Sequence, residues 1–230
     1  MGTLPFGPLK RFAVFGGSFD PVHVGHLSVA QQVLNALHLE KVILLPAATP
    51  PHKRDGRELA PAADRLAMCE LAVFNLHGLE ASDFELRKTG VSYTVETARI
   101  LREAYGPLAQ IHFLIGSDCL AELEHWYEVH ELLGLLDFAI AERRDAPLKD
   151  SLWRDVQAAL GADAEARLRR GIVPVEHVDV SSTLVRQLLR RGERIPGYLR
   201  RDVEDYIRSK GLYGAPPVPT RGGHFSGTWE

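Results

Sequence analysis

The sequence predicts an α/β protein built on a Rossmann-like, doubly wound parallel sheet with helices on both faces. Short apolar runs alternate along the chain with stretches in which apolar residues recur at helical spacing. This alternation is typical of parallel sheets whose crossover helices cover both sides. Two of the runs end in glycine turns, at Gly16 and Gly116. In such folds ligands bind beyond the carboxyl ends of the strands, so the two turns are expected to share one cleft.

The strands are predicted from short runs of Val, Ile, Leu and Phe bounded by polar or turn residues. Phe12-Ala13-Val14-Phe15 is the first such run, and Ile111 to Ile115 is another clear one. The predicted strands cover residues 12–15, 41–47, 79–86, 110–115, 137–142 and 172–178. The pattern is weakest at 79–86, where polar residues interrupt it.

Helices are predicted where apolar residues recur every three or four positions. After the first strand, this spacing is shared by His26, Ala30, Val33, Leu34 and Leu37. The predicted helices cover residues 23–39, 62–76, 93–105, 152–169, 182–190 and 199–210. A further helical segment that contains Trp126 is expected after the turn at Gly116.

One domain is expected over residues 1–213, with a C-terminal helical part at about 182–213. The chain has 230 residues, which is enough for one α/β domain with a full core. Residues 214–230 are rich in Pro, Gly and Thr and lack apolar periodicity. A mobile tail is therefore predicted there.

The composition favours a soluble protein without a nucleic-acid or membrane partner. The formal net charge is −3, whereas nucleic-acid-binding domains are strongly basic. No apolar run approaches the roughly 18–20 residues of a membrane span, and no secretory signal is visible. Cys69 and Cys119 form no CxxC pair and are expected to be free thiols in a reducing compartment. A cytoplasmic location is expected, and the oligomeric state stays open.

Residues 16–26, GGSFDPVHVGH, are the most informative stretch of the chain. They join a predicted strand to a predicted helix that begins with His23 and His26, which share one helix face because they are three residues apart. The first-turn N–H groups of a helix are unpaired, and its dipole end is positive. Free amides, two imidazoles and a close glycine backbone together predict an anion site for phosphate.

Other sites built on glycine or histidine fit this stretch less well. The dinucleotide fingerprint requires GxGxxG and the P-loop requires GxxxxGK[ST], and neither is present. Without a third Cys, His or carboxylate nearby, His-x-x-His is a poor ligand set for zinc.

A second phosphate-binding segment is predicted at 181–186, SSTLVR, where a strand is followed by a helix. Serine and threonine at a helix start cap free N–H groups and can also bind phosphate. Arg186 lies one turn beyond Ser182, and its planar guanidinium matches phosphate oxygens. Lys53, at the end of the stiff loop Pro50-Pro51-His52-Lys53, is a further cation for phosphate.

These motifs resemble those of the HxGH nucleotidylyltransferase superfamily. GGSFDPVHVGH is similar to its first motif, with Ser18 where threonine is common, and residues 180–186 resemble ISSTxIR with valine at 180 and 185. Three middle segments resemble the nicotinate-nucleotide adenylyltransferase family: PPHK at 50–53, SYTVET at 92–97, and Gly116-Ser117-Asp118 followed by Trp126. The resemblance implies adenylyl transfer from ATP to nicotinate mononucleotide, giving nicotinate adenine dinucleotide and pyrophosphate, a step of NAD biosynthesis.

The resemblance also implies residue roles. Catalysis is assigned to His23, His26, Lys53 and Arg186. ATP binding is assigned to Gly16, Gly17, Ser18, Phe19, His23, His26, Gly116, Asp118, Ser182, Thr183 and Arg186. Nicotinate nucleotide binding is assigned to Ser18, Lys53, Ser92, Tyr93, Thr94, Trp126 and Tyr127. ATP and nicotinate mononucleotide are thus the expected partners, Mg²⁺ the expected cofactor, and Asp118 a candidate ligand for the metal or for a ribose hydroxyl.

Two rival hypotheses stay open at this point. One is another nucleotidylyltransferase of the superfamily, with phosphopantetheine or a similar acceptor, against which Trp126 and Ser92-Tyr93-Thr94 argue. The other is a nucleotide-binding regulator that has lost catalysis, against which the intact histidine pair and Arg186 argue. Asp83 and Glu85, in the weak strand at 79–86, are expected to be structural rather than an acid–base pair.

Overall fold

The fold is a six-stranded parallel sheet in the part of the chain that the structure describes. The structure is a computed structural model, and it describes residues 4–49, 59–88, 91–193, 195 and 197–217. Its strands are β1 (Arg11–Gly17), β2 (Lys41–Pro46), β3 (Leu79–Ala81), β4 (Gln110–Gly116), β5 (Asp137–Arg143) and β6 (Ile172–Val175). Their order in the sheet is β3-β2-β1-β4-β5-β6, and each neighbouring pair is parallel. The predicted doubly wound α/β class is confirmed.

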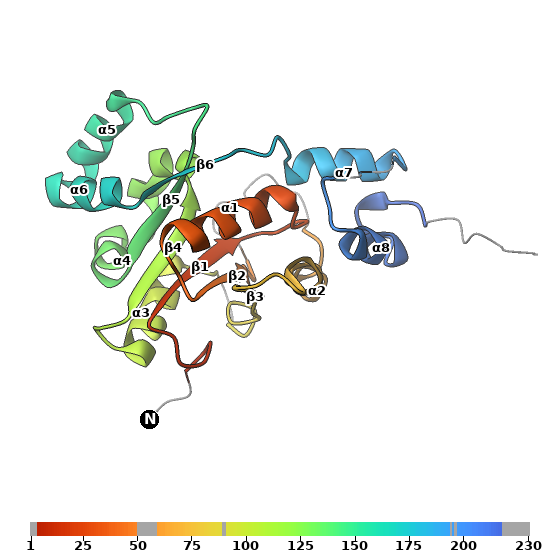
Figure 1. Cartoon of the computed structure of the whole chain (residues 1–230), viewed down its shortest axis with the longest axis horizontal. Coiled ribbons are helices and arrows are strands. Elements are labelled where there is room, and N and C mark those ends of the chain that lie inside the picture. Colours follow the sequence, from red (N-terminus) through yellow and green to blue (C-terminus); the bar gives the residue numbers. More distant parts are fainter. Residues whose placement is uncertain (1–3, 50–58, 89–90, 194, 196, 218–230) are drawn as a thin grey trace, which may run out of the picture.

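Helices cover both faces of this sheet (Figure 1). One face carries α1 (Val24–Ala36) and α2 (Ala62–Val73), and α7 (Ser182–Arg190) and α8 (Arg201–Ser209) extend the same hydrophobic cluster. The other face carries α3 (Thr94–Tyr105), α4 (Val129–Leu135), α5 (Asp150–Leu160) and α6 (Ala162–Arg170). Two 3₁₀ helices, η1 (Ser117–His125) and η2 (Leu212–Gly214), complete the described elements. The strand order reverses between β1 and β4, which is where ligands bind in such folds.

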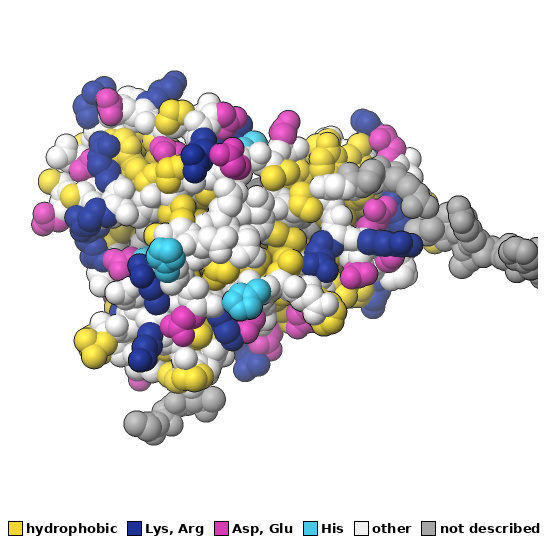
Figure 2. Space-filling view, viewed as in Figure 1, with side chains coloured by type: hydrophobic (Ala, Val, Ile, Leu, Met, Phe, Trp, Pro, Cys, Tyr) yellow, Lys and Arg dark blue, Asp and Glu magenta, His cyan; other side chains and the backbone are white. Residues whose placement is uncertain are grey.

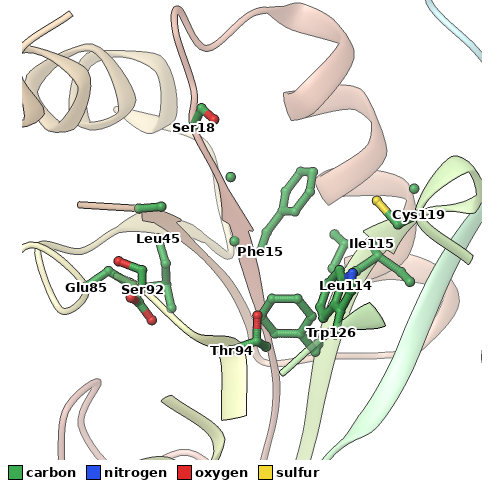
Figure 3. A pocket seen from close by; sticks show the side chains of 15 residues that line it. Phe15, Ser18, Leu45, Glu85, Ser92, Thr94, Leu114, Ile115, Cys119 and Trp126 are labelled. Carbon is green, nitrogen blue, oxygen red and sulfur yellow. The ribbon is translucent and has the colours of Figure 1, made fainter. Parts of the chain in front are cut away.

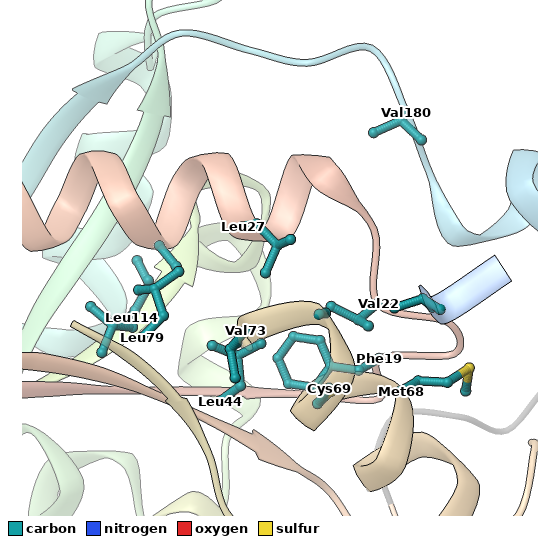
Figure 4. Packing of buried hydrophobic residues seen from close by; sticks show 14 of the residues in the cluster. Phe19, Val22, Leu27, Leu44, Met68, Cys69, Val73, Leu79, Leu114 and Val180 are labelled. Atoms are coloured by element: carbon teal, nitrogen blue, oxygen red, sulfur yellow. The ribbon is translucent and has the colours of Figure 1, made fainter. Parts of the chain in front are cut away.

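The core on the α1 face reaches into the turn that follows β1. Phe19 and Val22 from that turn pack with Leu44, Met68 and Cys69, all of them buried (Figure 4). The same cluster includes Val185, Leu189, Val203 and Ile207. Helices α7 and α8 are therefore held against the turn by apolar packing, and Figure 1 shows them beside the start of α1.

Three predicted elements differ from the structure. The single helix predicted at 152–169 is wrong: Gly161, with φ +91°, separates α5 from α6, in a conformation that glycine adopts more readily than other residues. The strand predicted at 79–86 ends at Ala81. Residues 84–87 form a turn instead, so Glu85 lies on a loop. Trp126 directly follows η1 rather than lying inside a helix.

The chain after α8 packs back onto the domain. The Tyr213 hydroxyl donates to Asp20 Oδ1 at 2.9 Å, Ala215 is buried, and Arg208 Nη1 donates to the carbonyl of Pro216 at 3.4 Å. The first residues of the predicted tail are thus packed. Residues 218–230 lie outside the described part of the chain.

The surface mixes charges of both signs. On the face in Figure 2, Lys and Arg side chains are interspersed with Asp and Glu, and no large single-sign patch is visible. Both cysteines are free thiols, as predicted. No helix in the described residues has the length and apolar character that a membrane crossing requires.

Two glycines with positive φ offer a test of core packing. Gly78 precedes β3 with φ +76°, and an added Cβ would lie 2.6 Å from Cδ2 of the buried Leu34. Gly106 follows α3 with φ +72°, and a Cβ added there would have nothing within 4 Å.

Gly106→Ala is expected to lower the free energy of unfolding by about 1–2 kcal/mol through backbone strain. Gly78→Ala is expected to lower it by about 1–3 kcal/mol more through overpacking. Urea denaturation measures both losses, and equal losses would contradict the packing argument.

Candidate active site

The turn after β1 is shaped by aromatic rings that lie against its glycines. A Cβ on Gly16 would lie 2.9 Å from the Phe113 ring, and one on Gly17 would lie 3.1 Å from the Phe19 ring. Phe19 itself has φ +45°, which is uncommon for a non-glycine residue. The buried Phe19 ring holds this sharp turn against the core. These contacts explain why the motif has two glycines before Ser18.

The two histidines predicted to share a face are stacked. Their ring centroids are 3.7 Å apart with an interplanar angle of 27°. The backbone N–H of His23 donates to Nδ1 of His26 at 3.2 Å, so a neutral His26 ring carries its proton on Nε2. The Phe19 ring lies 5.1 Å from His26, edge to face. The pair is therefore oriented by both a hydrogen bond and packing.

Burial makes both imidazoles neutral in the ligand-free protein. It lowers the pKa of His23 to about 4. It also lowers the pKa of His26, and the neighbouring His23 lowers it further. Nδ1 of His23 is buried and makes no hydrogen bond within the described residues. Both rings are therefore neutral hydrogen-bonding groups at neutral pH and are not a fixed pair of cations.

The start of α1 has fewer free amides than the sequence predicts. Val24 N–H donates to the carbonyl of Tyr198 at 3.0 Å, and His26 N–H donates to the carbonyl of His23 at 3.0 Å. The Tyr198 contact comes from the segment before α8, which no local pattern identifies. These two amides, which the sequence predicts to be free, are therefore occupied by backbone carbonyls.

The segment at 181–186 packs directly against the first motif. Ser181 Oγ accepts from Leu184 N–H at 3.1 Å, which confirms the predicted helix cap. Ser182 Oγ donates to the carbonyl of Pro21 at 2.9 Å, and Arg186 Nη1 donates to the carbonyl of Asp20 at 2.6 Å. Arg186 Nη2 also donates to Thr183 Oγ1 at 3.0 Å. The two predicted phosphate-binding clusters are therefore joined.

Asp20 connects these segments through its side chain as well. It is 1% exposed, and its Oδ1 accepts from Ala60 N–H at 3.0 Å and from the Tyr213 hydroxyl at 2.9 Å. Its Oδ2 lies 3.8 Å from Arg186 Nη1. Burial and this carboxylate raise the pKa of the Tyr213 hydroxyl, so it stays a hydrogen-bond donor.

Arg65 is a structural residue of the site that sequence reasoning missed. It is 1% exposed and donates to three carbonyls: Ser18 at 2.9 Å, Ala60 at 3.0 Å and Ala48 at 3.4 Å. The only sequence signal for this role is a positively charged residue among the apolar residues of α2. Its guanidinium fixes the turn after β1 relative to the end of β2 and the start of α2.

A cavity of about 350 Å³ opens beside the turn and is bordered by Thr94 at the start of α3 (Figure 3). It is lined by Phe15, Gly16, Gly17, Ser18, Leu45, Ala47, Glu85, Ser92, Thr94, Phe113, Leu114, Ile115, Gly116, Cys119 and Trp126. Trp126 is packed edge to face on Phe113 at 5.9 Å between centroids. Ser92 Oγ accepts from Ala48 N–H at 3.2 Å. The cavity thus combines apolar walls with a few polar groups, as small-molecule sites do.

The predicted site residues that the structure describes fall into three groups. Seven of them line the cavity: Gly16, Gly17, Ser18, Ser92, Thr94, Gly116 and Trp126. Phe19, His23, His26, Ser182, Thr183 and Arg186 lie around the adjoining turn. Tyr93, Tyr127 and Asp118 do not line the cavity. Tyr127 is 51% exposed and its ring lies 4.6 Å from that of Tyr93, and Asp118 is exposed. Lys53 lies outside the described residues.

The described residues contain no ready-made metal centre. No three His, Cys, Asp or Glu side chains among them are grouped as metal ligands. Asp118, next to Gly116 at the cavity, is a single exposed carboxylate. A lone carboxylate suits Mg²⁺ only when phosphate oxygens and water complete the coordination.

The chain is similar to known proteins over most of its length. Residues 14–188 match the cytidylyltransferase-like family. The chain is 37% identical to a probable nicotinate-nucleotide adenylyltransferase of Gemmatimonas aurantiaca, over 90% of this chain and 94% of that protein. It is 40% identical to a protein of the same name from Laribacter hongkongensis, over 90% and 96%.

A solved structure shares the fold. The Plasmodium falciparum nicotinic acid mononucleotide adenylyltransferase complexed with NaAD superimposes with a TM-score of 0.70 at 19% sequence identity, covering 90% of this chain and 98% of that chain. At this identity the likeness concerns the fold, which is the predicted one. On the family match and the curated relatives together, the chain belongs to the cytidylyltransferase-like family and, within it, to the nicotinate-nucleotide adenylyltransferases.

Proposed function

We propose that this protein transfers the adenylyl group of ATP to nicotinate mononucleotide, forming nicotinate adenine dinucleotide and pyrophosphate in NAD biosynthesis. The names of its relatives support this activity. In the structure, two neighbouring binding regions support this activity. The turn that carries His23 and His26 is hydrogen-bonded to the Ser182–Arg186 segment, and this turn adjoins a cavity with aromatic walls. One subsite suits a triphosphate, and the other suits a nucleotide with a flat ring.

The chemistry needs positioning and charge stabilisation more than a nucleophilic side chain. A phosphate oxygen of nicotinate mononucleotide attacks the α-phosphorus of ATP in line. The bond from that phosphorus to the bridging oxygen breaks, and its electron pair leaves with pyrophosphate. His23 and His26 hold phosphate oxygens while this charge moves. The Nε2 proton of His26, set by the His23 N–H bond, supplies a preorganised donor.

The triphosphate is held by residues from both ends of the chain. Gly16, Gly17 and Ser18 bring the backbone close to it, and Phe19 orients the histidine ring. Ser182, Thr183 and Arg186 hold the β- and γ-phosphates, and Gly116 and Asp118 lie toward the nucleoside of ATP. Support comes from the hydrogen bonds that tie Ser182 and Arg186 to the turn before His23. Lys53 is proposed to contribute a further positive charge to the phosphates.

The acceptor nucleotide occupies the cavity on the α3 face. Its pyridine ring packs on Trp126, whose own position is set by Phe113. Its carboxylate lies at the start of α3 beside Ser92 and Thr94, where a helix N-terminus favours negative charge. Ser18 lies at the end of the cavity that takes the phosphate of the acceptor nucleotide. Tyr93 and Tyr127 stack on each other at the start of the same helix, outside the lining, and are proposed to shield the ring from there.

Mg²⁺ accompanies ATP, and Asp118 is the described carboxylate nearest in sequence to the cavity-lining Gly116. The metal supplies positive charge to the triphosphate and the leaving pyrophosphate. Because Asp118 is exposed and belongs to no group of three potential ligands among the described residues, it would hold the ion only together with phosphate oxygens.

A pyrophosphate-release assay tests the function. The protein, with ATP and Mg²⁺, receives nicotinate mononucleotide, nicotinamide mononucleotide or phosphopantetheine in turn. Release with the nicotinate acceptor above the other two is expected. Release with phosphopantetheine alone would indicate a different acceptor, and no release with any acceptor would indicate a regulator without catalysis.

His26→Ala is expected to reduce kcat on the order of 10²–10³-fold, because one preorganised donor to the reacting phosphate is lost. His77→Ala is the matched control, since His77 is an exposed histidine in the turn before β3, at the end of the sheet opposite the site. Steady-state kinetics measure both variants, and thermal unfolding checks that both are folded. Turnover near the wild-type value in His26→Ala would contradict the assigned role.

ATP binding is expected to draw a proton onto His23. Burial holds the pKa of His23 at about 4, and its Nδ1 accepts no hydrogen bond from the described residues. Phosphate charge beside the ring raises this pKa, so a proton is taken up on binding, whereas His26 stays neutral because its Nδ1 accepts from His23 N–H. The affinity for ATP therefore rises as the pH falls from 7, and levels off near the free-state pKa of about 4.

Titration calorimetry in buffers of different ionisation enthalpy measures this uptake. His23→Gln isolates the histidine contribution, because the ionisation of ATP itself is common to both proteins. The variant is expected to take up fewer protons than the wild type. Equal uptake by the two proteins would show that the pair stays neutral in the complex.

A further inference from the structure

Tyr213 reaches from the C-terminal part of the chain to the turn after β1. It lies in η2, which packs against α7 and α8. Its hydroxyl donates to Asp20 Oδ1 at 2.9 Å, across 193 residues of sequence. Asp20 precedes His23 by three residues in the first motif. The proposed reaction assigns a role to neither Tyr213 nor Asp20, although both contact the segment that carries the histidine pair.

The backbone of Tyr213 is held in an uncommon conformation. Its φ of +59° and ψ of 17° lie in the left-handed region, which bulky side chains rarely adopt. Gly211 and Gly214 on either side also have positive φ, +61° and +71°. Strained residues persist only where the surrounding structure over-determines them, and they concentrate at functional sites. The hydroxyl bond to Asp20 and the packing of Tyr213 on the α1-face cluster are the contacts that hold it.

Asp20 connects this contact to Arg186. Its Oδ1 accepts from both the Tyr213 hydroxyl and Ala60 N–H, while its Oδ2 lies 3.8 Å from Arg186 Nη1. Arg186 Nη1 also donates to the backbone carbonyl of Asp20 at 2.6 Å. The two donors on Oδ1 fix the rotation of the carboxylate and therefore the position of the oxygen beside the guanidinium. Without the hydroxyl, the carboxylate and Arg186 can shift together.

We propose that Tyr213 is a positioning residue for nucleotidyl transfer, which acts through Asp20 on Arg186 and so sets the affinity for the triphosphate of ATP. This inference rests on the proposed function, because it takes Arg186 to hold phosphate. Tyr213 itself touches no substrate. The segment after the last α-helix thus contributes to the geometry of a site whose first motif lies near the start of the chain.

Tyr213→Phe tests the proposal, with Tyr206→Phe as the matched control. The Tyr206 hydroxyl also donates to an aspartate, Asp64 Oδ1 at 2.7 Å, but Asp64 lies on α2 and not in the histidine turn. Tyr213→Phe is expected to raise the Kd and the KM for ATP about fivefold, the scale of one neutral hydrogen bond. The KM for nicotinate mononucleotide is expected to stay unchanged.

Tyr206→Phe is expected to leave the ATP affinity and both KM values unchanged. Calorimetry and steady-state kinetics measure these constants, and thermal unfolding measures the stability that each variant loses. Wild-type ATP affinity in Tyr213→Phe, or equal losses of ATP affinity in the two variants, would overturn the proposal. A comparable rise in the KM for nicotinate mononucleotide would also overturn it, because a general structural defect affects both substrates.

A double-mutant cycle shows whether the effect passes through Arg186. Arg186→Lys keeps the positive charge but loses the planar fork. Because residues of one network act non-additively, adding Tyr213→Phe to Arg186→Lys is expected to change the Kd for ATP by less than about twofold. A full additional loss, equal to that in the wild-type background, would show that Tyr213 acts by another route, and the proposal would be wrong.

Two measurements on the wild type keep the outcome decisive. If Tyr213→Phe does not fold, hydrogen exchange carries the test, because coupling between two sites is reciprocal. ATP is then expected to slow exchange of Ala215 N–H, which donates to the carbonyl of Leu212 across Tyr213, and unchanged exchange would overturn the proposal. If the wild type binds ATP but releases no pyrophosphate, the proposed function fails by itself, and calorimetry of wild type and Tyr213→Phe still decides the role of Tyr213.

Discussion

The arrangement of the site depends on the buried carboxylate of Asp20. It accepts from Ala60 N–H and from the Tyr213 hydroxyl and lies beside Arg186, which also binds its backbone carbonyl. A buried charge persists only when it is paired and hydrogen-bonded. The turn that carries the histidines therefore takes this shape only when α7 and the segment after α8 are in place. The first motif and the C-terminal helices are one structural unit, although they lie at opposite ends of the chain.

Much of the fold could be predicted because it is encoded in local periodicity. The strand at β1 and the helix at α1 differ from their predicted ranges by only a few residues at their ends, since a buried run and a helical apolar stripe are short-range patterns. The cap at Ser181 is equally local. The histidine pair and the Ser182–Arg186 segment are recognisable as motifs, but the sheet order does not imply their contact, because β6 lies three strands away from β1.

The features that were missed depend on contacts between distant segments. Arg65 binds carbonyls on three separate stretches, and no helical pattern reveals which carbonyls a buried guanidinium reaches. Val24 N–H is occupied by Tyr198, which changes the number of amides at the start of α1. The sequence predicts a strand that includes Glu85 because apolar residues recur from Leu79 to Leu86, whereas in the structure the strand ends at Ala81. Burial, which makes the histidines neutral, is likewise a property of the whole fold.

The two subsites share one wall. Phe15 packs on Phe19 at 5.5 Å between ring centroids and lies 6.1 Å from His26, and it also lines the cavity. Leu45 and Trp126 line the cavity without belonging to the cluster that supports the histidine turn. Substitutions at residues without shared partners act almost independently, so evolution can exchange the molecule that receives the nucleotide through this second wall. The same scaffold can then serve several transfer reactions that differ only in their second substrate.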